Sequence, residues 1–285
     1  MIFIKLLLTT TGKISETYRL FDSLEKQFDI NVTFKLIIVF VNQSKINFDF
    51  SIYKNFDVNI INYQNCSLSE ARNLALGFQT VECSIVGFPD DDCWYPINFF
   101  SDLSNNFNIN ATNLIICTRV FDPIKNMQYG FRPIKKKPIN YANFSYLPIS
   151  VGIYVFNAQQ ELYFNPNFGA GTNNICGEET IYLAEHMKFN AIFFYNGNLT
   201  VYHEIPSDTN DIKKLLKYSY AYGKTYNYIF MNYSKLHFIG FLYFTFILIV
   251  SFLKSFINFD GHTKFKFHRL ISFISGFANI PIYTK

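Results

Sequence analysis

The chain has 285 residues, of which 49% are hydrophobic, and a formal net charge of +4. This length suits one domain with an appendage or two small domains, and the apolar content is ample for a core, which excludes a disordered polypeptide. The five cysteines are odd in number and lack the paired spacing of a metal site, so the sequence predicts a reduced compartment.

Apolar runs and amphipathic segments alternate through the first part of the chain. The order strand, helix, strand, strand, helix, strand is typical of a parallel α/β sheet, whose ligand site lies at the carboxyl ends of the strands. The expected strands cover residues 1–9, 34–41, 56–63 and 82–88, and the expected helices cover 15–28 and 68–79, the second capped by Ser67 or Ser69.

Three consecutive carboxylates, Asp90, Asp91 and Asp92, follow the fourth of these strands. Adjacent like charges repel, and desolvation at the end of a buried strand penalises each of them, so the cluster needs a positive partner. Mg²⁺ and Mn²⁺ fit because they prefer oxygen ligands from one or two carboxylates, with water and substrate phosphates in the remaining positions. The alternative is a solvated acidic turn that caps the following helix.

Arg72 lies one turn into the helix expected at 68–79. From there it can reach a phosphate or a base at the carboxyl edge of the sheet, and a helix N-terminus itself favours anions. The alternative is an exposed arginine paired with Glu70. The sequence has no glycine-rich phosphate loop of either common type, which counts against a dinucleotide-binding fold and against a nucleoside triphosphatase.

A second informative stretch begins with the glycine-rich residues 168–177. Glu178 and Glu179 follow it and precede a helix expected at 181–188, so the pair is either a general base or a complement to the helix dipole. His203 ends a later strand and is either structural or a nitrogen ligand to a metal. The other expected elements are a helix at 96–107, a basic loop at 132–138 and strands at 113–120, 149–156, 190–195 and 199–204.

Together these motifs resemble the family 2 inverting glycosyltransferases with a GT-A fold, over about residues 1 to 205. The resemblance is carried by the Thr-rich end of the first strand, Ala-Arg-Asn at a helix start, Asp-Asp-Asp-Cys-Trp, the run from Gly-Ala-Gly-Thr to Gly-Glu-Glu-Thr, and Val-Tyr-His. It implies an α/β fold in which helices flank a mixed, mostly parallel sheet.

The resemblance also implies a role for each motif. Asp90 and Asp92 would form a DxD element that holds Mg²⁺ or Mn²⁺ together with His203, and Asp90 would also face the ribose. Glu179 would be the catalytic base, with Glu178 in reserve. The nucleotide-sugar contacts that it implies are Thr9, Thr11, Asn42, Arg72, Asp90 and Asp91.

Two positions depart from the family's pattern. The family has a Glu-Asp pair, whose second member is the base, where this chain has Glu178 and Glu179. The extra methylene moves that carboxylate by about one C–C bond length, in a reaction that is sensitive to displacements of about 1 Å. Asn42 stands where an Asp would grip the nucleobase; an amide can still pair with a base edge, and the choice between uracil, guanine and thymine stays open.

The implied reaction transfers a sugar, with inversion, from a nucleotide-diphosphate sugar to a hydroxyl of a glycan or lipid-linked oligosaccharide in surface polysaccharide synthesis. Hydrolysis is disfavoured because diphosphate-binding features have no role in a simple glycosidase. The alternative is a non-catalytic nucleotide-sugar or glycan-binding module on the same fold. Nucleic acid is not an expected partner, because the positive charge flanks an apolar run and is not interleaved with stacking aromatics.

A change in composition divides the chain into an expected catalytic domain, residues 1–210, and a helical C-terminal region, residues 211–285. The second region contains ten basic and two acidic residues, with expected helical segments at 212–230, 238–253 and 265–277. The apolar run at 238–253 is shorter than the roughly 20 residues of a spanning helix, and basic residues flank it. The sequence therefore predicts peripheral or monotopic binding to the cytoplasmic face of the plasma membrane. The alternative is a helix pair packed on the catalytic domain or on a second subunit, so a homo-oligomer stays open.

Overall fold

The computed structural model describes residues 2–28, 34–105, 113–129, 135–144, 150–156, 162–205, 211–257 and 262–281. Two compact units interleave along the chain. The first comprises Met1–Pro138, Leu147–Phe164 and Asn190–Ile205, and the second Ile139–Tyr146, Asn165–Phe189 and Pro206–Lys285. Residues 165–189 group with the C-terminal helices and not with the sheet. The expected domain boundary at residue 210 stays a prediction.

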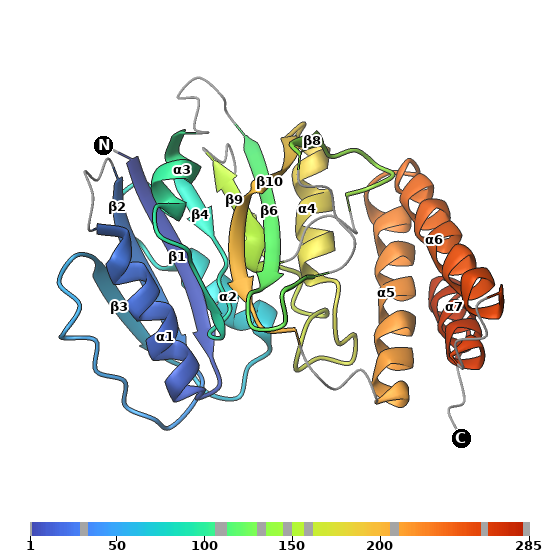
Figure 1. Cartoon of the computed structure of the whole chain (residues 1–285), viewed down its shortest axis with the longest axis horizontal. Coiled ribbons are helices and arrows are strands. Elements are labelled where there is room, and N and C mark those ends of the chain that lie inside the picture. The colour runs from blue at the N-terminus through green and yellow to red at the C-terminus, as the bar shows by residue number, and fades with distance from the viewer. Residues whose placement is uncertain are drawn as a thin grey trace. The chain divides into compact units, whose positions relative to one another are not determined.

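The first unit is built on a mixed, mostly parallel sheet, which confirms the fold class (Figure 1). Its strands are β1 (Ile2–Thr10), β2 (Phe34–Asn42), β3 (Asp57–Asn62), β4 (Ile85–Gly87), β5 (Cys93–Trp94), β6 (Leu114–Asp122), β7 (Met127–Gln128), β8 (Lys137–Pro138), β9 (Ile153–Phe156) and β10 (Ile192–His203). The main path runs β3-β2-β1-β4-β9-β6-β10-β5. Strands β3, β2, β1 and β4 are mutually parallel, as are β6 and β10, whereas β9 lies antiparallel between β4 and β6.

One strand prediction is wrong in its boundaries. The strands expected at 190–195 and 199–204 form a single strand, β10, whose register against β6 shifts between Asn196 and Thr200. A bulge absorbs extra residues without ending a strand, so the polar residues between the two apolar runs interrupt the pattern but not the backbone pairing.

Side-chain alternation along β1 assigns the helices of the first unit to opposite faces of the sheet. Leu6 packs with Phe21 in one buried cluster on the first face. Lys5 points to the other face, where its Nζ donates to the carbonyl oxygens of Leu76 (3.1 Å) and Phe78 (2.8 Å). A buried lysine thus supplies donors for carbonyls left unpaired at a helix end. These helices are α1 (Ile14–Glu25) and α3 (Phe99–Asn105) on the first face and α2 (Leu68–Gly77) on the second.

The second unit is helical, with α4 (Glu178–Lys188), α5 (Ile212–Asn232), α6 (His237–Ile257) and α7 (Thr263–Phe277). Aromatic rings join the last three helices: Tyr226 of α5 contacts both Phe241 of α6 and Phe273 of α7. At 21 residues and a mean hydropathy of 2.0, α6 is long and apolar enough to cross a membrane. The expectation that this apolar segment is too short to span is therefore wrong, because the helix continues past the predicted run at both ends.

His186 gives the second unit a pH-dependent stability. The ring is 1% exposed, and burial lowers its pKa from 6.5 to about 4. Between these values the unfolded chain takes up a proton that the folded chain does not, so unfolding becomes easier as the pH falls, by about 3 kcal/mol at pH 4. We expect His186→Leu to lose this part of the slope in urea unfolding measured from pH 7 to pH 4. Parallel slopes for the two proteins would contradict this origin.

Candidate functional site

Asp90, Asp92 and His203 meet at the carboxyl edge of the sheet. Asp90 forms a parallel bridge with Thr9 at the end of β1. Pairing of β5 with β10 sets His203 opposite Cys93, directly after the acidic residues. One ligating atom from each of the three residues lies within 4.8 Å of the others. Two carboxylates and an imidazole at this spacing suit Mn²⁺ well and Mg²⁺ adequately.

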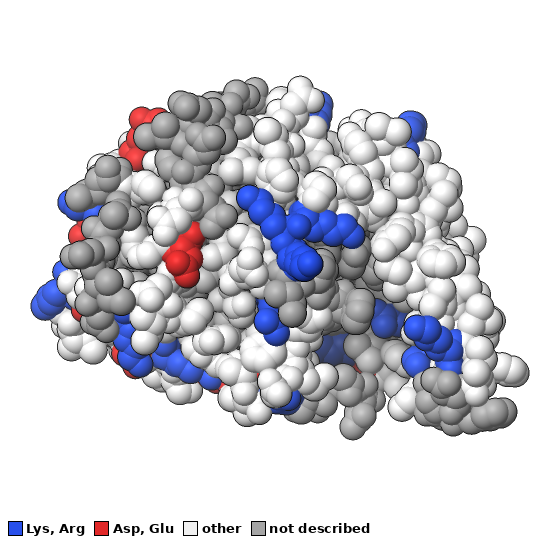
Figure 2. Space-filling view, turned by 45° about the horizontal axis from the view of Figure 1, so that its top comes forward, with Lys and Arg blue, Asp and Glu red and all other residues white. Residues whose placement is uncertain are grey.

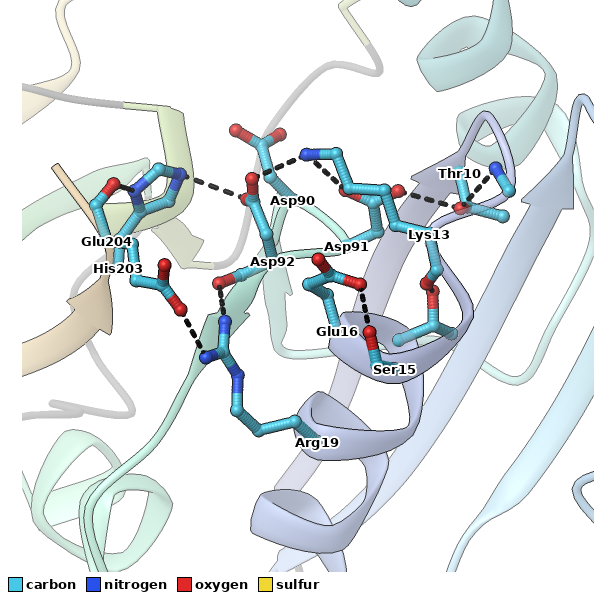
Figure 3. A network of polar contacts seen from close by, with 12 residues as sticks. Thr10, Lys13, Ser15, Glu16, Arg19, Asp90, Asp91, Asp92, His203 and Glu204 are labelled. Atoms are coloured by element: carbon cyan, nitrogen blue, oxygen red, sulfur yellow. Dashed lines mark hydrogen bonds and ion pairs between the residues drawn. The ribbon is translucent and has the colours of Figure 1, made fainter. Parts of the chain in front are cut away.

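The ring of His203 is oriented by a backbone hydrogen bond. Its Nδ1 lies 2.7 Å from the carbonyl oxygen of Glu204, which can only accept, so Nδ1 carries a proton. Nε2 points at Asp92, 3.0 Å from Oδ1 (Figure 3). Burial lowers the pKa of His203, but the hydrogen bond and charge of Asp92 outweigh this and raise it. A hydrogen bond from one ring nitrogen leaves the other available to a metal.

Asp92 is held between His203 and Lys13. On the side away from His203, Lys13 Nζ lies 2.6 Å from Asp92 Oδ2 and 3.4 Å from Asp91 Oδ1 (Figure 3). Burial alone would raise the pKa of Asp92, but His203 and Lys13 together hold it well below its usual range. Asp91 turns toward β1, where Thr10 Oγ1 donates to it at 2.7 Å. Because burial is its largest influence, the pKa of Asp91 is raised.

Arg19 of α1 ties the acidic loop to the end of β10. Its Nη2 donates to the backbone carbonyl oxygen of Asp92 at 2.9 Å, and its Nη1 pairs with Glu204 Oε1 at 2.5 Å. The guanidinium also lies 3.9 Å from the centre of the Trp94 ring. Since the carbonyl belongs to Asp92 and Glu204 follows His203, this arginine positions Asp92 and His203 relative to each other.

Arg72 is buried and contacts the side chain of Asp90. It is 1% exposed, and its Nη2 lies 3.0 Å from Asp90 Oδ1. Glu70 instead closes a capping box with Ser67, which is the N-cap of α2. The alternative of an exposed arginine paired with Glu70 is therefore wrong. The guanidinium donates a charge-assisted hydrogen bond to this carboxylate and fixes its position beside Asp92 and His203.

Comparison with known structures places the fold. No protein-family model and no curated protein sequence matches the chain. S. aureus TarS 1–349 in complex with UDP-GlcNAc is similar, with a TM-score of 0.59 and 14% identity over 99% of this chain and 82% of that one. So is the mannosyltransferase PcManGT from Pyrobaculum calidifontis, solved with GDP-Man and Mn²⁺, with a TM-score of 0.57 and 8% identity over 98% and 88%. The chain has the GT-A fold.

Within this GT-A fold, the other predicted nucleotide-sugar residues lie at the same sheet edge. Thr9 is buried at the end of β1, and Thr11 is exposed in the turn that follows. Asn42 ends β2 and is 3% exposed. Its amide donates to the Ile46 carbonyl and accepts from the backbone and hydroxyl of Ser44, so this side chain shapes the adjoining loop. Contact of these residues with a nucleotide sugar stays a prediction.

Glu178 and Glu179 open α4 in the second unit of the GT-A chain. Glu178 is buried and Glu179 is partly exposed. Gly177 precedes them as the N-cap, with a left-handed φ of 96°. A Cβ at this glycine would lie 2.0 Å from Thr225 Oγ1, so only glycine allows α5 to approach the start of α4. The base predicted at Glu179 is therefore carried on a helix whose N-cap, Gly177, packs closely against Thr225.

We expect Gly177→Ala to destabilise the chain by about 2 to 4 kcal/mol, because it combines an unfavourable φ with overpacking. Gly77→Ala is the matched control: the nearest atom to its Cβ is the Tyr163 hydroxyl at 3.9 Å. Its effect should be within about 1 kcal/mol and can be stabilising, since alanine suits a helix better. Urea unfolding of both variants measures the difference, and equal free energies of unfolding would refute the packing argument.

Three contributors to this site were missed from the sequence: Thr10, Lys13 and Arg19. Thr10 stands inside the predicted Thr-rich strand end, and its position beside Thr9 and Thr11 is the sequence signal for it. Lys13 is the N-cap of α1, which starts at the same sheet edge as the acidic loop, and Arg19 lies further along this helix. A basic residue at the start of a helix that follows such a strand is the only sequence signal that they carry.

Proposed function

We propose that the chain is a metal-dependent, inverting glycosyltransferase of the family 2 type, acting on a nucleotide-diphosphate sugar and a hydroxyl of a glycan or lipid-linked oligosaccharide in surface polysaccharide synthesis. The observation that carries this proposal is the Asp90, Asp92 and His203 cluster, with ligating atoms within 4.8 Å, at the carboxyl edge of a GT-A sheet. Similar folds that were solved with UDP-GlcNAc and with GDP-Man and Mn²⁺ support the donor class.

The proposed role of each group in the reaction follows from its chemistry. Mg²⁺ or Mn²⁺ held by Asp90, Asp92 and His203 supplies positive charge that offsets the charge growing on the leaving diphosphate. Glu179 takes the proton of the acceptor hydroxyl. The acceptor oxygen bonds to the anomeric carbon from the face opposite the diphosphate, the bond to the diphosphate oxygen breaks, and the configuration inverts. Arg72 holds Asp90 in place through its contact at 3.0 Å.

Ligand binding tests the donor class first. With Mn²⁺ present, we expect one of UDP-, GDP- or dTDP-sugars to raise the Tm of the chain, and EDTA to remove that increase. No increase with any of the three would contradict the proposal. The second candidate is a non-catalytic binding module, which is favoured by the presence of Glu instead of Asp at position 179. Release of nucleoside diphosphate distinguishes the enzyme from this module. Such a module would bind the same donor without releasing nucleoside diphosphate.

The surface of α6 supports the membrane part of the proposal. Only 22% of its most apolar window is buried. In Figure 2 the right-hand surface, where the C-terminal helices lie, is mostly uncharged, with Lys and Arg side chains at its margins. Lys235 and Lys254 flank the apolar stretch, which suits a helix lying in an anionic leaflet. The exposed apolar stripe comprises Ile239, Leu242, Phe246, Ile249, Leu253 and Phe256.

We expect the double substitution Phe246→Asp and Phe256→Asp to weaken sedimentation with vesicles that contain anionic lipid by at least about 100-fold, because each ring contributes about 2 kcal/mol of apolar burial. The control pair is Ile124→Asp and Met127→Asp, which changes two residues of the first unit that are 71% and 55% exposed. Unchanged vesicle binding, together with loss of a dimer in the stripe variant, would assign the stripe to a second copy of the chain instead.

A further inference from the structure

We propose that Lys13 competes with the divalent cation for Asp92 and binds the donor diphosphate once that cation is present. This inference rests on the proposed function and adds a residue to it. Its basis is the position of Lys13, whose ammonium group bridges Asp91 and Asp92 at 3.4 and 2.6 Å (Figure 3). The described residues of this edge place no other lysine against the acidic loop.

Lys13 and a divalent cation compete for the carboxylate of Asp92. Both carboxylate oxygens of Asp92 already have partners, Nε2 of His203 at Oδ1 and the ammonium group of Lys13 at Oδ2. A divalent cation that binds Asp92 must share it with Lys13 or displace it, and like charges a few ångströms apart repel. Removing the lysine charge therefore makes the site more attractive to a metal ion.

Asp91 and Asp92 keep other contacts when the ammonium group of Lys13 moves away. Asp91 keeps its hydrogen bond from Thr10 at 2.7 Å, so it retains a partner when the ammonium group moves. Arg19 still holds the backbone carbonyl of Asp92 through a separate contact at 2.9 Å. The acidic loop is thus anchored independently of Lys13, and the lysine contact can be exchanged without disturbing the loop.

The ammonium group of Lys13 can move from Asp92 to the donor diphosphate. The Lys13 side chain is 46% exposed, and its four-carbon stem allows the charge to swing. A nucleoside diphosphate bound to the metal brings several negative charges to the same edge, and a lysine that has lost its carboxylate partner gains a phosphate partner of similar chemistry. Lys13 then helps to offset the negative charge of the leaving diphosphate, next to the cation.

Two binding titrations on the full chain test this role, one with Mn²⁺ alone and one with UDP and GDP at saturating Mn²⁺. We expect Lys13→Met to bind Mn²⁺ about tenfold more tightly than the wild type and to bind its preferred diphosphate about tenfold more weakly, as the loss of one charge-assisted contact implies. Lys13→Arg should restore diphosphate binding. Lys54→Met, which removes an exposed lysine outside the site, should match the wild type in both titrations.

Opposite shifts in the two titrations cannot result from a purely structural role, which would weaken both. Unchanged or weaker Mn²⁺ binding by Lys13→Met, or unchanged diphosphate binding, overturns the Lys13 proposal. Asp92→Asn separates this failure from failure of the proposed function. If Asp92→Asn binds Mn²⁺ as tightly as the wild type, the metal centre itself is misplaced and both proposals fall; if it binds weakly, only the role of Lys13 is lost.

Discussion

Asp92→Asn is expected to lower kcat/KM for sugar transfer by at least about 1000-fold, because stabilisation of the leaving diphosphate by a metal ion is worth several kcal/mol and each 1.36 kcal/mol is a factor of ten. Asp92 is the residue on which the site converges: His203 and Lys13 contact its side chain, and Arg19 contacts its backbone. The amide keeps the shape of the side chain but loses the charge that a cation requires.

Measurements of Mn²⁺ affinity and of Tm distinguish the loss of a metal ligand from a general loss of stability. The same variant should bind Mn²⁺ far more weakly in a calorimetric titration while its Tm stays within a few degrees of the wild type, since Lys13 and His203 can turn to solvent or to neighbouring groups. Asp57→Asn, which alters an exposed carboxylate at the start of β3, is the charge-matched control and should keep full activity. Full activity of Asp92→Asn would contradict the assigned metal centre.

Glu179→Gln is expected to reduce kcat by about 100- to 10,000-fold with little change in donor binding, because a general base contributes this much and acts only on the acceptor hydroxyl. Glu179→Asp should reduce kcat by a smaller factor, on the order of 100, because the carboxylate retreats by about 1 Å from the position that this chain uses. Steady-state assays of nucleoside diphosphate release, together with donor titrations, measure both quantities.

The neighbouring carboxylates decide which glutamate is the base. Glu178→Gln should affect kcat far less than Glu179→Gln, and Glu185→Gln, on the same helix, should leave it unchanged. If Glu178→Gln causes the larger loss, the base is the buried member of the pair. If neither substitution matters while the wild type turns over, the base lies elsewhere in the chain.

Much of the sheet could be predicted because its inner strands are continuous apolar runs. β1, β2 and β3 begin and end within two residues of the expected positions. β1 and β2 are buried along most of their length, and a strand covered on both faces is a nearly continuous apolar run. β9 was expected as a strand, but its antiparallel direction between β4 and β6 was not, because direction depends on how the chain returns to the sheet and leaves no local pattern.

The candidate metal centre was predictable only through its motifs. Asp90 and Asp92 are neighbours in the sequence, whereas His203 reaches them through the pairing of β5 with β10, a contact that no spacing rule contains. Asn42 marks the limit of this reasoning: its amide can pair with a base in principle, yet its donors and acceptor are engaged with Ile46, Asn62 and Ser44. Arg19 and Lys13 act through tertiary contacts alone, so residue type and spacing did not identify them.

Electron-nuclear double resonance of bound Mn²⁺ tests the central claim most directly, because it detects the nuclei that surround the ion. In the complex with the preferred nucleoside diphosphate, we expect a ¹⁴N coupling from an imidazole and ³¹P couplings from the diphosphate. In His203→Gln the imidazole ¹⁴N coupling should vanish while the ³¹P couplings remain. An ion without a nitrogen coupling in the wild type, or one whose nitrogen coupling survives in His203→Gln, would contradict a metal centre formed by Asp90, Asp92 and His203.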